Sequence, residues 1–390
     1  MTDAIYDLTQ VQLYDSSNPY QRFRDLLPIH NPGLMPNDAA YTPTVHAQRL
    51  GEVIGLPKLY LKDDTKLPTG TTKDRMAAVA LAYLFECGVQ SFCTSSTGNS
   101  STAYAQALTG FPDFRMYLFT AENFQNRVQY RDNPHIVHYL LRDATFAEAF
   151  EASGAFAKMN RFVSERGFFN LGRREGLKIS WLEAVDQIDG PIDWYVQAVS
   201  SAMGVYGAYK GGQEMRRLGR LPRPPRLLCV QQSSCAPMVR AWEEGAESIL
   251  PEHIVHNPQG IAKAILRGDP SKAYPIMRKI VLESEGVFTA VEELEIREAR
   301  AAVEELEGIS PCFSASTAVA GLMKLARLGK IPANHTVLIN LTGRNRTPSD
   351  DDAAHQDRRW LKRSAGGWIP EDPEAGGGLV YGNPAAPTKE

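Results

Sequence analysis

Short apolar runs of strand length alternate with longer segments of helical periodicity over most of this chain. The strand-like runs cover residues 59–62, 92–94, 115–120, 194–199, 226–230 and 336–341. The helical segments cover residues 73–86, 101–108, 146–163, 204–218 and 317–328. This alternation predicts an α/β fold with a twisted parallel sheet and helices on both faces. Ligands of such folds bind beyond the carboxyl ends of the strands, so the loops there are the places to search.

Composition and charge narrow the class of protein. The chain has 390 residues, 42 of them basic and 45 acidic, so its net charge is −3 and no concentrated basic face is expected. Nucleic acid is therefore not an expected partner. No apolar run approaches about 18 residues, so no membrane span is expected. The histidines and cysteines lack metal-ligand spacing, so no metal site is expected.

The five cysteines are an odd set with no CxxC pair, which favours reduced thiols in a cytoplasm over a disulfide framework. The acidic start of the chain lacks the apolar stretch of a secretion signal. Together these features predict a soluble cytoplasmic protein, large enough to be an enzyme.

The loop Leu67–Arg75 carries the sequence LPTGTTKDR between a strand and a helix. Lys73 stands at the helix start, where the positive end of the helix dipole disfavours a charged amine. A neutral amine is what a Schiff-base nucleophile requires. A solvated lysine beside Asp74 is the alternative that this motif alone leaves open.

Three later loops also end strands. Thr94–Ser101 places six hydroxyl residues around a glycine at a helix start, where amides and hydroxyls suit a carboxylate or phosphate. Simple capping of the helix accounts for one of those hydroxyls, but not for six. Val199–Gly204 and Leu341–Gly343 add small and hydroxyl residues at two further strand ends, and neither is informative alone.

Taken in order, the four loops resemble the threonine synthase branch of the fold-type II pyridoxal-phosphate enzymes. The family pattern has an N-P-T-G-S-F-K-D-R motif, an S-T-G-N-T loop, a glycine/asparagine phosphate loop and a late T-G. Here these are LPTGTTKDR at 67–75, STGNS at 96–100, SSAMG at 200–204 and TG at 342–343. Two weaker similarities are to the family's R-x-E-G-x-K segment, within residues 169–178, and to its K-D-E strand, within residues 56–64. The match runs from about residue 41 to about residue 344.

The resemblance implies a cofactor, pyridoxal 5′-phosphate, and a role for each loop. Lys73 would hold the cofactor as a Schiff base and then move the α-proton as catalytic base and acid. Asn99 would contact the 3′-oxygen, and Thr342 the ring nitrogen. The cofactor phosphate would lie in the turn of Ser200, Ser201, Ala202, Met203 and Gly204. The substrate α-carboxylate would bind Ser96, Thr97 and Ser100, and an anionic side group would bind Arg173 and Lys178.

Departures from the family pattern bear on the reaction. Phe168 and Phe169 stand where the family has polar residues that bind the phosphate of phosphohomoserine. The loop expected to bind the cofactor phosphate lacks the family's asparagine. Phenylalanine cannot replace the lost hydrogen bonds.

The implied function is elimination or replacement at Cβ or Cγ of an activated amino acid, with O-phosphorylated amino acids among the candidate substrates. A β-replacement of the cysteate synthase or diaminoacid synthase kind is preferred. Threonine synthase acting on O-phosphohomoserine is the alternative, and a surface salt bridge with Glu175 is the alternative role for Arg173 and Lys178.

The resemblance also implies a two-lobed tryptophan synthase β-like architecture. A large cofactor-binding lobe is expected over 1–77 and 186–350, a small mobile lobe over 78–185, and a C-terminal tail over 351–390. The family usually forms homodimers, and its substrates are small amino acids. A non-catalytic relative that binds an amino acid or a partner protein is the alternative from another class. A serine hydrolase is disfavoured, because the chain lacks a G-x-S-x-G elbow.

Overall fold

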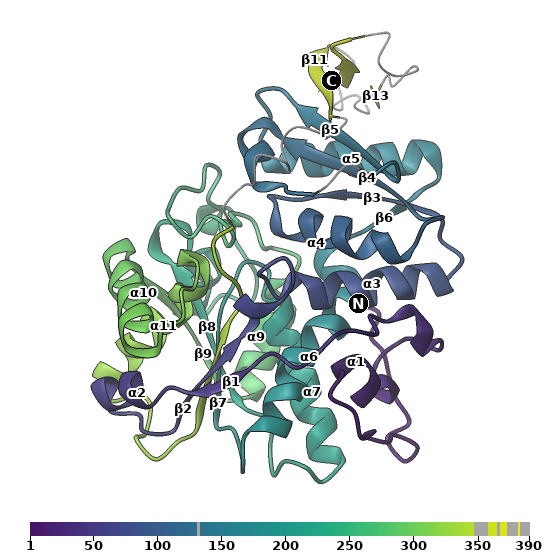
Figure 1. Ribbon diagram of the computed structural model, residues 1–390. Helices are drawn as coiled ribbons and strands as arrows, with labels where there is room; N and C mark the ends of the chain where they lie inside the picture. The colour runs from purple at the N-terminus through teal and green to yellow at the C-terminus, as the bar shows by residue number, and fades with distance from the viewer. Residues whose placement is uncertain (131–132, 347–357, 365–366, 373–380, 383–390) are drawn as a thin grey trace. The chain divides into compact units, whose positions relative to one another are not determined.

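The computed structural model describes residues 1–130, 133–346, 358–364, 367–372 and 381–382 (Figure 1). The chain divides into two compact units, and each is built around its own sheet. Unit 1 comprises Met1–Val79 and Leu171–Arg346, and unit 2 comprises Ala80–Asn170 and Thr347–Glu390. The predicted α/β fold with two mostly parallel sheets is confirmed.

The sheet of unit 1 has six strands. In spatial order they are β1 (Thr44–His46), β2 (Leu59–Asp63), β10 (Val337–Leu341), β7 (Trp194–Ala198), β8 (Arg226–Gln232) and β9 (Val287–Val291). All neighbours are parallel except β1, which runs antiparallel to β2. The strands are buried and rich in Val, Leu and Ile, as expected of a parallel sheet covered on both faces. The carboxyl ends of β2, β10 and β7 therefore meet at one edge.

Helices cover both faces of this sheet. Unit 1 contains α1 (Pro19–Arg22), η1 (Arg24–Leu26), η2 (Pro32–Leu34), α2 (Gln48–Ile54), η3 (Asp64–Lys66), α6 (Leu171–Gln187), α7 (Met203–Arg217), η7 (Ser233–Cys235), α8 (Pro237–Glu243), η8 (Pro251–His253), α9 (Tyr274–Glu283), α10 (Glu293–Glu307) and α11 (Phe313–Arg327). Helix α3 (Lys73–Glu86) begins in unit 1 and ends in unit 2. Helices α10 and α11 lie on one face of the sheet, and α6 and α7 on the other (Figure 1).

Helix α6 belongs to unit 1, whereas the small lobe expected from the sequence extends to residue 185, within this helix. The physical reason is its close packing on α7. A Cβ added at Gly207 would lie 2.9 Å from the carbonyl oxygen of Arg174, and one at Gly211 would lie 2.9 Å from the Trp181 ring. Glycine at these two positions lets the helix backbones approach closely.

The sheet of unit 2 is also mostly parallel. Its strands, in spatial order, are β13 (Tyr381–Gly382), β12 (Gly367–Pro370), β11 (Arg358–Ser364), β5 (Ile136–Leu141), β4 (Arg115–Ala121), β3 (Ser91–Ser95) and β6 (Val163–Ser164). Its helices are α4 (Asn99–Ala107), η4 (Leu108–Gly110), η5 (Glu122–Arg127), α5 (Phe146–Asn160) and η6 (Gly167–Phe169). Helix α5 packs on β3 and β4 through aromatic side chains that include Phe119 and Phe156.

Part of the segment expected to be a C-terminal tail belongs to this sheet. Strand β11 pairs in parallel with β5, and Arg358 lies opposite His138. Leu361 and Trp368 are buried in the same apolar cluster as Phe119. The rest of the expected tail lies largely outside the described residues. None of the described helices is long and apolar enough to cross a membrane.

Candidate active site

The lysine loop joins β2 to α3, so Lys73 is the first residue of a helix at the carboxyl end of a strand. The Asp74 carboxylate closes the loop, because it accepts hydrogen bonds from the amide of Thr69 at 2.7 Å and from its hydroxyl at 2.5 Å. Burial raises the pKa of Asp74 to about 6, although both Thr69 hydrogen bonds act in the opposite direction. Gly70 has φ +72°, and a Cβ there would lie 2.8 Å from Nε of Arg344.

The lysine loop is bound to the loop that follows β10. The Thr72 amide donates to the carbonyl oxygen of Thr342 at 2.9 Å, and the Arg344 amide donates to that of Gly70 at 2.9 Å. A Cβ added at Gly343 would lie 2.8 Å from the Gly70 carbonyl oxygen. The two motifs meet because β2 and β10 are adjacent parallel strands.

From the sequence, Arg344 and Arg346 are expected either to act near the cofactor or, by preference, to pair with Asp350–Asp352. Those aspartates lie outside the described residues. The structure shows Nε of Arg344 donating to the carbonyl oxygen of Thr65 at 3.2 Å. Arg344 therefore contacts the residues before the lysine loop through its side chain and Gly70 within the loop through its amide.

The third loop of unit 1 connects β7 to α7. It ends with Ala202 in the left-handed conformation, φ +62°, and helix α7 begins at Met203. The first amides of a helix have no partner within the helix and point outward, so this turn offers donors and a positive dipole end to an anion. A Cβ added at Gly204 would lie 2.6 Å from Oε1 of Gln197, so the turn needs glycine there. Since β7 pairs with β10, this turn and Thr342 end neighbouring strands.

The hydroxyl-rich loop belongs to unit 2 and joins β3 to α4. Oγ of Ser96 accepts hydrogen bonds from the amides of Gly98 at 3.0 Å and Ser101 at 3.3 Å. Gly98 has φ +129°, and a Cβ there would lie 2.6 Å from the carbonyl oxygen of Arg127. Asn99 and Ser100 form the first turn of α4, and both are half-buried, as is Thr97. The loop thus gathers hydroxyls and amides at a helix start, and its role in binding a carboxylate stays a prediction.

Lys178 lies in the interior on α6. Its Nζ donates to the carbonyl oxygen of Leu26 at 2.7 Å, to Glu175 at 2.6 Å and to Glu214 at 2.8 Å. Burial alone would lower the pKa of Lys178, but the Glu175 and Glu214 carboxylates outweigh it and raise the pKa. These three bonds use the three N–H groups of the ammonium. Lys178 is expected from the sequence at a substrate anion, but its ammonium has no N–H group left to bind one.

Arg173 stands in the first turn of α6 and is 6% exposed. A second arginine, Arg267, is electrostatically coupled to it. Burial lowers the pKa of Arg267, Asp269 partly offsets this effect, and the charge of Arg173 lowers the pKa further. A guanidinium group binds an anion through charge-assisted hydrogen bonds, so an anion within reach of both side chains would be stabilised by both. Sequence reasoning missed Arg267, which lies in a loop without a recognisable motif.

The residues at the edge of the unit 1 sheet match the polar parts of pyridoxal 5′-phosphate. An amine at position 73 suits the aldehyde, the amides of the α7 turn suit the phosphate, and the Thr342 hydroxyl suits the ring nitrogen. Oγ1 of Thr72, beside Lys73, is buried without a hydrogen-bond partner among the described residues, so a polar atom of the cofactor could bond to it. Within the described residues, no group of His, Cys, Asp and Glu could hold a metal ion.

Comparison with known proteins agrees with this geometry. The family model described as "Pyridoxal-phosphate dependent enzyme" matches residues 37–343. The threonine synthase of Methanosarcina acetivorans is 30% identical, over 88% of this chain and 85% of its own length. The cysteate synthase of Methanosarcina barkeri is 27% identical, over 83% of this chain and 80% of its own.

Solved structures share the fold. The serine racemase of Dictyostelium discoideum has a TM-score of 0.62 at 20% identity, over 78% of this chain and 93% of its own length. The family match spans the lysine loop, the hydroxyl-rich loop and the turn before α7, and it ends at the glycine after Thr342. This chain belongs to the family of pyridoxal-phosphate dependent enzymes.

Proposed function

We propose that this enzyme catalyses elimination or replacement at the side chain of an activated amino acid, with β-replacement of the cysteate synthase kind preferred. The observation that carries the proposal is the pairing of the Lys73 loop with the Thr342 loop at one sheet edge. Relatives named threonine synthase and cysteate synthase, which cover most of the chain, support this class of reaction.

The cofactor supplies the electronic part of the chemistry: when bound, it withdraws electrons from the α-carbon, so the α-proton and a side-chain leaving group depart more easily. Lys73 then acts through Nζ, which takes the α-proton and later returns one. Its place at the start of α3 favours the neutral amine that can accept this proton.

The other residues bind and orient. In the proposal, the turn of Ser200, Ser201, Ala202, Met203 and Gly204 holds the cofactor phosphate through amides. The Thr342 hydroxyl contacts the ring nitrogen, and the Asn99 amide contacts the 3′-oxygen. Ser96, Thr97 and Ser100 bind the substrate α-carboxylate with the first amides of α4.

An anionic side group on the substrate is proposed to bind Arg173 and Arg267. A phosphate leaving group offers several oxygens, which suit two guanidinium groups. This arrangement serves a phosphorylated serine or a phosphorylated homoserine equally. Threonine synthase therefore stays as the second candidate, favoured by the relative of that name with 30% identity.

A direct experiment tests the cofactor linkage. Purified protein is reduced with borohydride, digested and analysed by mass spectrometry, and a pyridoxyl adduct on Lys73 is expected. The variant Lys73→Ala should lose both the adduct and the violet absorbance of the yellow wild-type protein. A wild-type protein that takes up no added cofactor, or that carries its adduct on another lysine, contradicts the proposal.

A product assay distinguishes the two reactions. O-phosphoserine supplied with sulfite gives cysteate by β-replacement, whereas O-phosphohomoserine gives threonine by γ-elimination and β-addition of water. Cysteate formation with no threonine supports the preferred reaction, and the reverse result selects threonine synthase. Turnover of neither substrate, in a protein loaded with cofactor, contradicts both.

We also propose that the enzyme works as a homodimer in the cytoplasm. The odd number of cysteines and the lack of a CxxC pair support a reducing compartment. Light scattering of the purified protein tests the dimer, which requires about twice the 43.1 kDa mass of one chain.

A further inference from the structure

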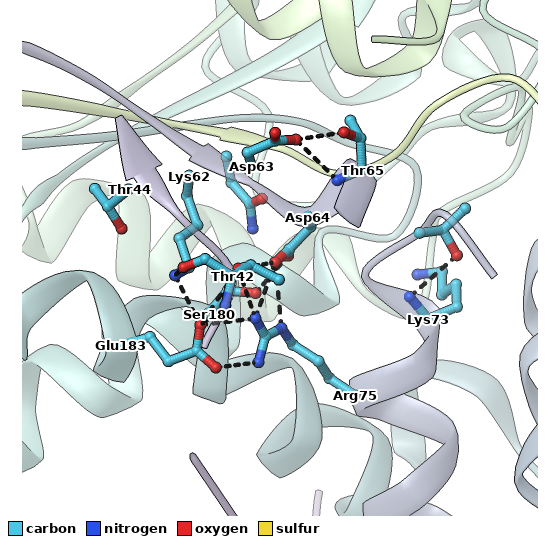
Figure 2. A network of polar contacts seen from close by, with 12 residues as sticks. Thr42, Thr44, Lys62, Asp63, Asp64, Thr65, Lys73, Arg75, Ser180 and Glu183 are labelled. Carbon is cyan, nitrogen blue, oxygen red and sulfur yellow. Dashed lines mark hydrogen bonds and ion pairs between the residues drawn. The ribbon is translucent and has the colours of Figure 1, made fainter. Parts of the chain in front are cut away.

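A buried cluster of four charged side chains lies at the start of α3 (Figure 2). Lys62, Asp64, Arg75 and Glu183 have side chains that are at most 1% exposed. Two are cations and two are carboxylates, so the cluster is neutral as a whole. All four residues belong to unit 1.

Arg75 is the centre of this charge cluster. Its Nη1 and Nη2 lie 2.6 and 2.8 Å from the two carboxylate oxygens of Glu183, which is a bidentate pair. Its Nε and Nη2 donate to Oδ1 of Asp64 at 3.2 and 3.1 Å. Burial alone would lower the pKa of Arg75, but Glu183 and Asp64 outweigh it and raise the pKa, so the guanidinium stays charged.

The remaining oxygens of the cluster are also bonded. Nζ of Lys62 lies 2.7 Å from Oε2 of Glu183 and donates to the Thr42 carbonyl oxygen at 2.6 Å. Oγ of Ser180 donates to Oδ2 of Asp64 at 2.6 Å. Every carboxylate oxygen in the cluster therefore has a donor, which leaves each side chain a single favourable position.

Helix α6 holds the same turn of α3 in a second way. Gly176, Ser180 and Glu183 are spaced by four and three residues, so they share one face of α6. A Cβ added at Gly176 would lie 2.4 Å from the carbonyl oxygen of Arg75 and 2.9 Å from Cα of Met76. The side chain and the backbone of Arg75 are thus both fixed by this face of α6.

Such a cluster is a poor device for stability alone, because removing four charges from water costs much of what their attraction returns. The cluster has a larger effect on the position of the residues at the start of α3 than on stability. Arg75 follows Lys73 by two residues in the first turn of α3, and Figure 2 shows Arg75 reaching into the cluster while Lys73 lies outside it. A fixed helix start gives the Lys73 backbone one position.

We propose that Arg75 is a positioning residue for Lys73, which it holds in place through Glu183 and Asp64. This inference rests on the proposed role of Lys73 as the cofactor lysine. It assigns the bidentate Arg75–Glu183 pair a function in the reaction, although neither side chain is proposed to touch cofactor or substrate.

The test compares Arg75→Lys and Glu183→Gln with the matched control Glu214→Gln. Arg75→Lys keeps the charge but loses the bidentate geometry, and Glu183→Gln keeps the shape but loses the charge. Glu214 is another buried carboxylate that bonds two lysines, at 2.8 Å to Lys178 and 2.7 Å to Lys210. Each apoprotein is mixed with pyridoxal 5′-phosphate, and the borohydride-trapped Lys73 adduct is followed in time well below every Tm.

We expect both cluster variants to form the Lys73 adduct about tenfold more slowly and to lose about tenfold in kcat, with KM within about threefold, because small displacements of a reacting group are costly. The control should form the adduct at the wild-type rate even if its Tm falls as much as the Tm of the cluster variants.

Wild-type adduct rates in the cluster variants, or equal slowing in the control, overturn the proposal. Should Arg75→Lys fail to fold, Glu183→Gln decides. A wild-type protein without an adduct at Lys73 contradicts the proposed function instead.

Discussion

The amide of Thr72 donates a 2.9 Å hydrogen bond to the carbonyl oxygen of Thr342. This bond joins the residue before Lys73 to the first residue after β10, two residues that lie far apart in the sequence. Thr71 and Gly343 form an isolated antiparallel bridge beside it. Any change that separates these two loops should therefore alter the lysine and the ring-nitrogen contact together.

The first prediction concerns Gly343→Ala. The new methyl group would meet the Gly70 carbonyl oxygen at 2.8 Å and the Thr71 side chain at 2.9 Å, so the two loops must move apart. We expect a loss of ~1–3 kcal/mol in the free energy of unfolding, together with weaker retention of pyridoxal 5′-phosphate. Urea unfolding and cofactor absorbance after dialysis measure the two effects.

A matched control for that variant is Gly154→Ala in α5, where nothing lies within 4 Å of the added Cβ. It should stabilise by up to ~1 kcal/mol through helix propensity and leave cofactor retention unchanged. Unimpaired retention in Gly343→Ala would show that the loop pairing does not support the site.

The second prediction concerns pH and Asp74, whose pKa is raised from 3.8 to about 6 by burial. A raised pKa in the folded state adds stability below the unfolded value, and that stability is lost as the pH rises through about 6. The free energy of unfolding of wild type minus that of Asp74→Asn should therefore be ~2 kcal/mol larger at about pH 4.5 than at about pH 7.5.

Urea unfolding of the two apoproteins at both pH values measures this difference. Asparagine can still accept a hydrogen bond from the Thr69 amide and donate one to its hydroxyl, so the loop should keep its shape. A difference that is the same at both pH values would mean that Asp74 does not titrate in this range.

The third prediction concerns Ala202, whose φ of +62° is strained for any residue with a Cβ. Ala202→Gly should stabilise the protein by ~1 kcal/mol, and cofactor affinity should stay within about threefold because amides hold the phosphate. Ala301→Gly, on the exposed face of α10, should have the opposite effect and destabilise by ~1 kcal/mol. Thermal unfolding and cofactor titration measure both variants, and a destabilised Ala202→Gly contradicts the argument.

The fourth prediction concerns the proposed anion site. Arg173→Met and Arg267→Met should each raise KM for an O-phosphorylated substrate about tenfold or more, because each removes a charged hydrogen-bond donor. The exposed Arg297→Met on α10, which removes a pair with Glu293 and a contact with the Phe313 ring, is the control and should leave KM unchanged. Steady-state kinetics on O-phosphoserine and O-phosphohomoserine decide the point. Unchanged KM values in both arginine variants would place the substrate anion elsewhere.

Much of the local structure follows from the sequence. The helix expected over 73–86 is α3 with those bounds, and the strand expected over 194–199 is β7 at Trp194–Ala198. Local periodicity sets these elements, because a strand buried on both faces must be continuously apolar and a covering helix must be amphipathic. The lysine motif and the late T-G were also visible, since short motifs are local in the chain.

The tertiary structure decided which distant residues meet. No local signal pairs Asp64 and Glu183 with Arg75, although the K-D-D and K-D-R stretches mark two of the segments involved. Lys178 stands at a motif position, yet Glu175 and Glu214 engage it in the interior. The amino-acid order fixes propensity and pattern over a few turns, whereas partners of buried charges depend on which helices pack together. That is why the lysine could be identified from the chain alone, and the cluster that holds its helix only from the fold.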